Sequence, residues 1–393
     1  MAHWEEVHAQ PDYAGVTSTE RRGGFYRRYH PDHMAHALQL LDPETTEYAL
    51  STTARVGVLG ERLRARPLPL LYATLIRSES IASSWVEGER ETPRNIMLAR
   101  LDHERASTAG QRIARNIDAM RTAIERLDGI WTHEDIHRVH QTLLPELKST
   151  GYRHEPVFIG GNSALTARFV PPPHEDVPGY MDDLLSYINT SGDSPLAAAL
   201  LTHAQFETVH PYPDGNGRVG RALFHGVLHR AGVVTGGVLP LSTALKRDKE
   251  AYVKALTAYR YDGNASSSTT GGMNTTRRAA TSAYVTAMLD FVNRAVDFTT
   301  QFTQQVDEVL DRWSQVLSGH RSDSSVHRAV DVLIQQPVVT IGYLQDELQV
   351  TKLTAHTCLK SLVNAGVLHP SGGKLKRANL FQADDVLRIL ELA

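Results

Sequence analysis

The chain has 393 residues and a formal net charge of −3, from 41 lysines and arginines against 44 aspartates and glutamates, which excludes a polycationic nucleic-acid coat. A hydrophobic content of 41% with 22% charged residues is typical of folded globular domains, and the single cysteine, Cys358, excludes an intramolecular disulfide or a four-cysteine metal cluster. The sequence shows neither a secretory pattern at its N-terminus nor an apolar run of about 20 residues, so we expect a cytoplasmic protein.

The N-terminal part is predicted to be helical after an irregular start. The first forty residues show no strong period, and we expect a packed or partly mobile arm there. Apolar residues then recur at helical spacing over Pro43–Gly60 and Leu68–Glu87. Later stretches with the same spacing predict helices over Ala106–Leu127, His133–Leu144 and Val177–Asn189.

One extended segment interrupts these helices. Pro156–Ile159 is followed by a Gly160–Asn162 turn signal, then by Thr166–Val170 and by three prolines. Gly-Gly-Asn supplies positive φ angles, and the prolines prevent further pairing on one side. We therefore predict a short β-hairpin.

Helices are predicted on both sides of a glycine-rich turn and again near the C-terminus. They cover Pro195–Val209, Arg218–Ala231, Lys246–Tyr259 and Ala280–Leu317. The small, polar stretch Asn264–Thr276 cannot bury much apolar surface, and it is expected to be a mobile insertion. A polar break at Ser318–Ser325 marks a domain boundary.

The C-terminal region has the pattern of a winged helix-turn-helix. Three helical runs cover Val326–Gln335, Thr340–Leu348 and Thr351–Ala365, and an extended segment follows at Leu375–Phe381. Three helices and a two-stranded wing form this fold, with Thr351–Ala365 as its second turn helix.

Most of the residues that are suited to catalysis or ligand binding lie between His210 and Arg221. The glycines of Gly215-Asn216-Gly217 can turn backbone N–H groups toward one point, and the helix that follows adds its positive end, so the turn is suited to hold a phosphate. Arg218 and Arg221 lie three residues apart, on one helix face, where guanidinium groups can bind phosphate oxygens. A carboxylate at Asp214 beside phosphates suits Mg²⁺, and His210 is suited to accept a proton. These parts together indicate nucleotide chemistry.

This run, His210-Pro-Tyr-Pro-Asp-Gly-Asn-Gly-Arg-Val-Gly-Arg221, resembles the Fic family signature His-Pro-Phe-x-Asp/Glu-Gly-Asn-Gly-Arg-x-x-Arg. Tyr212 replaces the usual Phe, and its hydroxyl needs a partner or water. The resemblance implies a nucleotidyltransferase that moves AMP from ATP to a Ser, Thr or Tyr hydroxyl of a target protein. It implies His210 as the general base, Asp214 as the Mg²⁺ ligand and Arg221 facing the γ-phosphate. The ATP phosphates are assigned to Gly215, Asn216, Gly217 and Arg218.

A second motif, Ser83-Ser-Trp-Val-Glu87-Gly88, resembles the inhibitory motif of the same family, Ser/Thr-x-x-x-Glu-Gly/Asn. Ser83 and Glu87 are four residues apart and share a helix face. The implied mechanism is autoinhibition, in which the Glu87 carboxylate pairs with Arg221 and competes with the ATP γ-phosphate. Read alone, this short motif also fits a surface glutamate on an amphipathic helix.

The hairpin resembles the flap of the family, which binds the target backbone as an added strand. The residues assigned to it are Ile159, Gly160, Gly161, Arg168, Phe169 and Val170. A purely structural hairpin is the alternative. Tyr252 is assigned to the adenine and Gln205 to the nucleotide border, whereas Glu207 is expected to brace the loop.

The expected fold is mainly α: a Fic-type helical bundle with a small β-hairpin flap and a C-terminal winged helix-turn-helix. The expected domains are 1–105 with the inhibitory motif, 106–263 as the catalytic core, 264–317 as insertion and connecting helices, and 326–393 as the winged helix. The expected partners are ATP with Mg²⁺ and a target protein, which can be the chain itself; a homodimer stays open.

Other functions compete with AMP transfer. The winged helix allows a DNA-binding regulator, although Lys352 and Lys360 are the only cations on its turn helix. The same pocket could remove AMP from a modified target, or use another nucleotide or a phosphocholine donor. His225 and His229 have zinc-pair spacing, but the neighbouring arginines disfavour a metal, and packing is the preferred interpretation.

Overall fold

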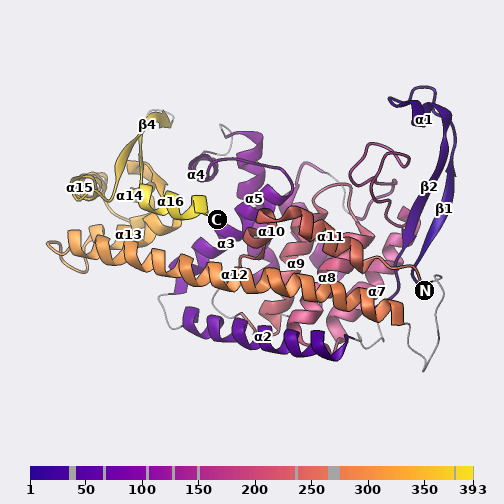
Figure 1. Cartoon of the computed structure of the whole chain (residues 1–393). Coiled ribbons are helices and arrows are strands. Elements are labelled where there is room, and N and C mark those ends of the chain that lie inside the picture. Colours follow the sequence, from indigo (N-terminus) through magenta and orange to yellow (C-terminus); the bar gives the residue numbers. More distant parts are fainter. Residues whose placement is uncertain are drawn as a thin grey trace. The chain divides into compact units, whose positions relative to one another are not determined.

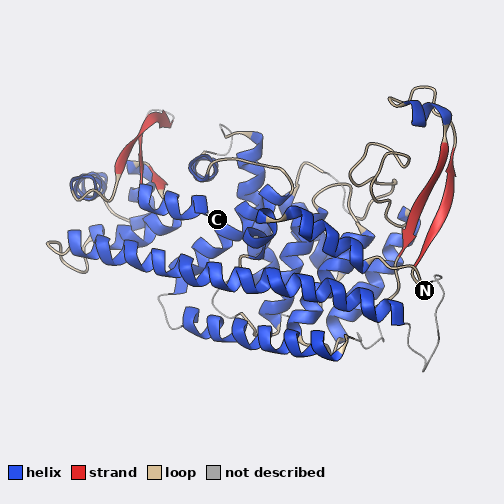
Figure 2. Ribbon diagram, viewed as in Figure 1, coloured by secondary structure: helices blue, strands red, loops and turns tan. Residues whose placement is uncertain are grey.

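Helices dominate the computed structural model of the chain, and Figure 2 shows strands only in an N-terminal ribbon and near the C-terminus. The structure describes residues 1–34, 41–64, 68–102, 106–125, 129–147, 151–234, 238–263, 275–375 and 378–392. Two compact units are each assembled from three stretches of chain. The first contains Met1–Arg55, Thr122–Val233 and Asp248–Phe291; the second contains Val56–Arg121, Val234–Arg247 and Val292–Ala393. The domain boundaries expected from the sequence, which divide the chain into consecutive segments, stay a prediction.

The elements follow in chain order, and Figure 1 labels most of them. They are β1 (His3–Ala9), α1 (Ser18–Arg22), β2 (Gly24–His30), α2 (Pro43–Arg64), α3 (Leu68–Val86), α4 (Pro93–Leu101), α5 (Thr108–Glu125), α6 (His133–Leu143), the 3₁₀ helix η2 (His174–Asp176), α7 (Val177–Thr190), α8 (Pro195–Val209), α9 (Asn216–Arg230), α10 (Leu241–Arg247), α11 (Lys249–Tyr259), α12 (Thr275–Val316), α13 (Ser325–Gln335), β3 (Val338–Val339), α14 (Ile341–Leu348), α15 (Lys352–Asn364), β4 (His369–Leu375), β5 (Ala378–Gln382) and α16 (Asp384–Leu392).

Helix α8 forms the centre of the first unit. From Leu196 to Val209 every residue is buried, as is expected for a helix that is apolar on all sides. Helix α9 packs closely on it at Gly220, where an added Cβ would lie 3.0 Å from Nδ1 of His203. The glycine therefore permits the close approach of the two helices that carry the signature.

The N-terminal arm is a β-ribbon, which the sequence did not indicate. Strands β1 and β2 pair antiparallel, from His3 opposite His30 to Ala9 opposite Gly24. At the tip, Thr17 and Glu20 form a capping box that begins α1. Most ribbon residues are half-buried or exposed, so neither strand needs one apolar face. The sequence therefore lacks the alternation of apolar and polar residues that would predict the strands.

Several predicted element boundaries are wrong. The helix predicted over Lys246–Tyr259 is two helices, because Asp248 leaves the helical region and its carboxylate caps α11 at Ala251 N. Helix α4 was not predicted, although Thr92 and Pro93 provide an N-cap and a first-turn proline. Helix α16 was also missed. The mobile insertion predicted at Asn264–Thr276 lies outside the described residues except for its last two positions.

The second unit joins the helices around the Ser83–Gly88 motif to the C-terminal elements. Arg94 of α4 donates from Nε to Ser371 Oγ at 3.0 Å and to Gln382 Oε1 at 3.1 Å. Gln336 donates from Nε2 to the carbonyl of Met97 at 2.9 Å. The C-terminal elements are a helix, a short strand, two helices and two strands, with sheet order β3-β5-β4, followed by α16.

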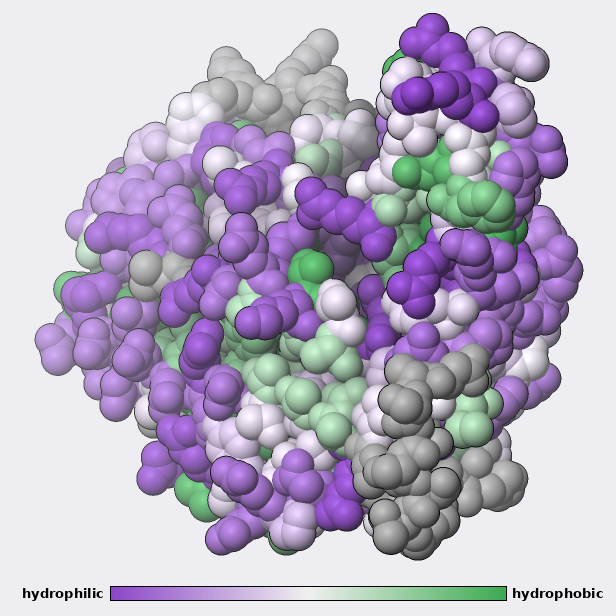
Figure 3. Space-filling view, turned by 45° about the vertical axis from the view of Figure 1, so that its right-hand side comes forward, coloured by the Kyte–Doolittle hydropathy of each residue, from purple (hydrophilic) through white to green (hydrophobic). Residues whose placement is uncertain are grey.

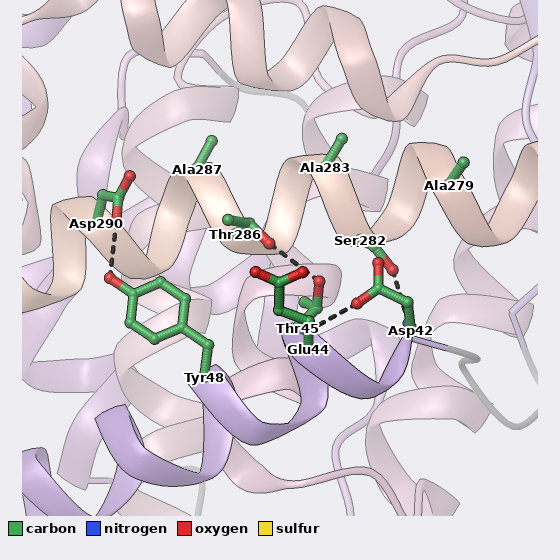
Figure 4. A pocket seen from close by; sticks show the side chains of 10 residues that line it. All are labelled: Asp42, Glu44, Thr45, Tyr48, Ala279, Ser282, Ala283, Thr286, Ala287 and Asp290. Atoms are coloured by element: carbon green, nitrogen blue, oxygen red, sulfur yellow. Dashed lines mark hydrogen bonds between the residues drawn. The ribbon is translucent and has the colours of Figure 1, made fainter.

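A groove lies between α2 and α12 of the first unit (Figure 4), with a volume of about 580 Å³. Tyr48 donates its hydroxyl to Asp290 at 2.7 Å, and Asp42 N donates to Ser282 Oγ at 2.9 Å. These hydrogen bonds hold the two helices together, and none of the signature residues lines the groove. Among the described residues, no helix is both long and apolar enough to cross a membrane.

Candidate functional site

His210 stands at the point where α8 ends. Its backbone is left-handed, with φ of +53°, and its N–H donates to the carbonyl of Phe206 at 2.9 Å. Such a φ is uncommon for a residue other than glycine, and histidine is one of the types in which it occurs more often. Pro211 follows and cannot continue the helix. The imidazole is 18% exposed, and its Nδ1 lies 3.8 Å from the Glu207 carboxylate.

Arg153 fixes the loop that carries His210, and sequence reasoning did not assign it a role. Its Nε donates to the His210 carbonyl at 2.9 Å, and its Nη2 donates to the carbonyl of Pro172 at 2.6 Å. Its own backbone N–H donates to the carbonyl of Pro211 at 2.8 Å. Burial lowers the pKa of Arg153 to about 10, which leaves it charged at neutral pH. One guanidinium therefore joins the His210 loop to the segment after the flap.

The glycine-rich turn is closed by the side chain of Asn216. Asn216 accepts from Tyr212 N at 2.9 Å and donates to the Tyr212 carbonyl at 2.7 Å. Gly215 has φ of +83°, and an added Cβ there would lie 2.9 Å from Leu144. Helix α9 begins inside the turn, at Asn216 rather than at the predicted Arg218. The turn thus ends on a helix N-terminus, as phosphate binding requires.

Two buried arginines lie near the start of α9. Arg218 is 1% exposed and Arg221 is fully buried. Nη2 of Arg218 lies 3.5 Å from Oδ1 of Asp214, whose side chain is 55% exposed. The same Oδ1 accepts from Gly215 N at 2.6 Å. A single exposed carboxylate at such a turn has the chemistry that Mg²⁺ prefers, since the ion usually takes one or two carboxylates with waters and substrate phosphates.

Two histidines of α6, His137 and His140, contact the residues of this turn. His137 Nδ1 and the hydroxyl of Tyr212 are 2.7 Å apart, so the hydroxyl that replaces the usual Phe has a hydrogen-bond partner. The His140 ring stacks on Tyr212 at 3.8 Å, and its Nε2–H donates to the Asp214 carbonyl at 3.1 Å. Burial lowers the pKa of His140 to about 4, so this imidazole is neutral at pH 7. In the sequence, these contacts are indicated only by the helical spacing of His133, His137 and His140.

A sequence model of the Fic/DOC family matches residues 130–228, which include α6, the flap and the signature. A Fido domain-containing protein of Dictyostelium discoideum is 35% identical over 106 residues, which are 27% of this chain and 67% of that protein. The chain belongs to the Fic/DOC family.

Two other comparisons extend beyond the Fic domain. A "Probable protein adenylyltransferase" of Aquifex aeolicus is 27% identical over 180 residues, 45% of this chain, and the alignment spans half of that relative. The crystal structure of a Fic family protein from Desulfovibrio desulfuricans aligns with a TM-score of 0.51 and 19% identity, over 88% of this chain and 98% of that one. At that identity the likeness shows the fold, which confirms a mainly helical Fic-type architecture with a small flap.

The Fic flap is shorter than the predicted hairpin. Only one bridge pairs its two sides, with Ile159 N donating to the Phe169 carbonyl at 3.0 Å. Gly160 has φ of +74°, and an added Cβ at Gly161 would lie 2.4 Å from the Thr166 carbonyl oxygen, so the tight turn requires these glycines. The proline run after Val170 provides no further donors to extend the pairing.

The predicted flap residues divide into two groups. Gly160 and Arg168 are exposed, and Ile159 and Gly161 are half-buried, whereas Phe169 and Val170 are buried. Phe169 packs in a cluster with Ala2 and Tyr29, and the guanidinium of Arg260 lies 3.5 Å from the centre of its ring. The exposed residues of the flap are therefore concentrated near its turn, and the binding of a target strand there stays a prediction.

The Ser83–Gly88 motif lies in the second unit. Helix α3 ends at Val86, so Glu87 occupies the turn after the helix, with its N–H donating to the Ser84 carbonyl at 3.1 Å. Ser83 is buried, Glu87 and Gly88 are exposed, and Gly88 has φ of +90°. The predicted pair of Glu87 and Arg221 joins residues of the two units and stays a prediction.

Tyr252 and Gln205 are buried near α8. The Tyr252 hydroxyl and His203 Nε2 are 2.9 Å apart. Gln205 donates to the Asp32 carbonyl at 2.8 Å and accepts from the Tyr259 hydroxyl at 2.9 Å. Both side chains thus have protein partners, and their contact with a nucleotide stays a prediction. Among the described residues, no group of three or more His, Cys, Asp and Glu side chains is placed to hold a metal ion.

Proposed function

We propose that this Fic protein is a protein adenylyltransferase, which transfers AMP from ATP to a side-chain hydroxyl of a target protein. The observation that carries the proposal is the placement of His210 beside the turn at the start of α9. A base at a fixed helix end, a helix N-terminus and two buried arginines meet within twelve residues. The names of relatives in this family, which include protein adenylyltransferases, support the same activity.

In the proposed reaction, the hydroxyl oxygen of the target attacks the α-phosphorus of ATP. A new P–O bond forms, the bond from the α-phosphorus to the bridging oxygen breaks, and pyrophosphate leaves. His210 accepts the hydroxyl proton. Its Nδ1 faces Glu207, so we assign Nε2 as the base. The N-terminus of α9 and Arg218 stabilise charge on the phosphates, and Arg221 binds the γ-phosphate.

Asp214 is the residue that would hold Mg²⁺. The ion would neutralise phosphate charge when bound with ATP, which a turn with one exposed carboxylate allows. The hydrogen bond from Gly215 N to Oδ1 of Asp214 fixes the orientation of that carboxylate before any ligand arrives.

Autoinhibition by Glu87 is part of the proposal. A carboxylate that pairs with Arg221 would take the place and the partner of the γ-phosphate, so ATP would bind unproductively. The mechanism predicts that Glu87→Gly raises AMP transfer. Removal of AMP by the same site remains the alternative reaction, and it would instead require Glu87.

The decisive experiment incubates the protein with α-labelled ATP, Mg²⁺ and a cell lysate. Four forms are compared: the parent, Glu87→Gly, Glu87→Gly with His210→Ala, and Glu87→Gly with His229→Ala as a matched histidine control outside the turn. We expect label on protein to rise with Glu87→Gly, to vanish with His210→Ala and to persist with His229→Ala. Label that survives His210→Ala would refute the assigned base.

For the C-terminal elements we propose a winged helix-turn-helix with α15 as its second turn helix. The exposed face of α15 carries Lys352 and Lys360 but also Leu353, which is 77% exposed. An exposed leucine between two lysines favours contact with protein over DNA phosphates. A gel-shift titration across salt concentrations tests the DNA alternative, since phosphate contacts require an affinity that falls steeply with salt.

A further inference from the structure

Arg260, the residue that follows α11, contacts both the flap and the helix that ends at His210. Its guanidinium carbon lies 3.5 Å from the centre of the Phe169 ring. Its Nε lies 3.5 Å from Oγ1 of Thr208, two residues before His210 on α8. All of these residues belong to the first unit. The sequence indicates neither contact, since 52 residues separate Arg260 from Thr208.

The Thr208 hydroxyl is oriented to accept a hydrogen bond from this guanidinium. Its proton is donated to the carbonyl of Ala204 at 2.8 Å, so its oxygen lone pairs are available to Nε of Arg260. Burial lowers the pKa of Arg260 to about 10, and the buried Glu207 carboxylate acts in the opposite direction, so the guanidinium is charged at neutral pH. Arg260 is therefore held at the end of α8 by a hydroxyl acceptor and by a neighbouring negative charge.

Phe169 is the residue through which Arg260 holds the flap. Its backbone forms the bridge that pairs the two sides of the flap, since it accepts from Ile159 N at 3.0 Å and donates to the Ile159 carbonyl at 3.2 Å. A cation over an aromatic face within about 6 Å is attracted by the ring, and most strongly where water is excluded. The position of the guanidinium therefore helps to fix the position of the bridge.

The N-terminal ribbon encloses the same ring. Figure 3 shows the ribbon at the upper right, with hydrophobic side chains below its hydrophilic tip. The rings of Trp4 and Tyr29 have centres 6.1 and 6.2 Å from that of Phe169. The Tyr29 hydroxyl also donates to the carbonyl of Tyr261 at 3.0 Å, and its backbone N–H donates to the carbonyl of Val170 at 3.1 Å. The segment after α11 is thus linked to two consecutive residues of the flap.

We propose that Arg260 is a positioning residue of AMP transfer, which holds the flap at a fixed distance from the end of α8, so that an acceptor hydroxyl bound at the flap lies within reach of His210. The inference rests on the proposed function, because the flap has an acceptor to align only if AMP is transferred to protein. A displacement of about 1 Å in a reacting group can cost about a hundredfold in rate. Loss of Arg260 therefore slows transfer to protein and leaves the binding of nucleotide unchanged.

The test compares variants that all carry Glu87→Gly. Arg260→Met keeps an unbranched apolar side chain but removes the charge and the donors, and Phe169→Leu removes the ring but keeps an apolar side chain. The two substitutions are also combined. Arg247→Met is the matched control, because Arg247 also lies over a phenylalanine, with its guanidinium carbon 5.6 Å from the centre of the Phe298 ring in the second unit.

Two quantities are measured for each variant. The first is the initial rate at which proteins of a clarified lysate are labelled from α-labelled ATP with Mg²⁺. The second is the Kd of α,β-methylene ATP, measured by equilibrium dialysis without lysate. Because this analogue lacks the bond that breaks in AMP transfer, its affinity reports on the nucleotide site alone.

We expect Arg260→Met to lower the labelling rate about tenfold to a hundredfold, with the Kd of the analogue within about twofold of the Arg247→Met control. Phe169→Leu is expected to lower the rate as well. The combined variant is expected to label within about twofold of the slower single variant, because both substitutions remove the same contact.

Three results would overturn the role of Arg260. One is a labelling rate of Arg260→Met equal to that of Arg247→Met, and another is a combined variant in which the two losses multiply. The third is a Kd that rises by the factor by which the rate falls, since the effect would then lie at the nucleotide site. The proposed function fails separately: it is refuted if Glu87→Gly labels no more protein than Glu87→Gly with His210→Ala.

Discussion

Because His140 is neutral in the folded protein, we predict that the folded protein loses stability in mild acid. Its ring is 1% exposed, stacked on Tyr212 and bonded through Nε2–H to the Asp214 carbonyl. Burial lowers its pKa to about 4 from an ordinary 6.5, and the positive charges of His137 and Arg218 act in the same direction, against the Asp214 carbonyl and carboxylate. Protonation therefore favours the unfolded chain, in which the imidazole regains its ordinary pKa.

The magnitude follows from the two pKa values. A group with a lowered folded-state pKa binds protons more readily when unfolded, so stability is lost as pH falls from about 6.5 toward 4. Between pH 7 and pH 5 the difference in proton binding costs about 2 kcal/mol of unfolding free energy. Since the imidazole is bonded to the Asp214 carbonyl, the turn that contains Asp214 is expected to loosen over the same pH range.

Urea unfolding at pH 7 and pH 5 checks this prediction. His140→Gln keeps an N–H donor at the position of Nε2 but cannot be protonated, and His320→Gln makes the same change at an exposed position. We expect the parent and His320→Gln to lose about 2 kcal/mol more than His140→Gln over this range. Equal losses in all three proteins would refute the assignment of the lowered pKa to His140.

Three further changes test the supports of the site. Tyr212→Phe should cost about 1 kcal/mol of unfolding free energy, because His137 loses a hydrogen bond. A double-mutant cycle with His137→Leu should give a coupling energy of similar size. If the effects of the two substitutions were additive, the hydrogen bond would be contradicted. Arg153→Lys should lower AMP transfer about tenfold to a hundredfold with unchanged circular dichroism, since a lysine cannot bond all the carbonyls that hold the His210 loop. Gly215→Ala should cost about 1–2 kcal/mol in urea unfolding, while Gly129→Ala, where an added Cβ meets nothing within 4 Å, should not.

The sequence alone predicts the candidate site because the residues of that site are close together in the chain. His210, Asp214 and Arg218 fall within one helix end, one turn and one helix start, so their spacing in the chain nearly fixes their spacing in space. The same locality made the Fic resemblance recognisable and the long, periodic helices predictable. The predicted helix boundaries are wrong where a single side chain sets the boundary, as Asp248 does between α10 and α11.

Only the tertiary structure could reveal the supports of the site, because they come from distant segments. The bond between His137 and Tyr212 spans 75 residues and that between Arg153 and the His210 carbonyl spans 57, and the sequence does not indicate either pair of partners. The ribbon is the clearest case. Strands β1 and β2 show no apolar alternation, and they are held by the pairing of their backbones and by contacts of Trp4 and Tyr29 with a flap about 140 residues later. Hydrogen-bond partners and packing surfaces that folding brings together leave no periodic pattern in the sequence. The sequence therefore determines which residues are the candidate catalytic groups, and folding decides which residues hold them and which surface surrounds them.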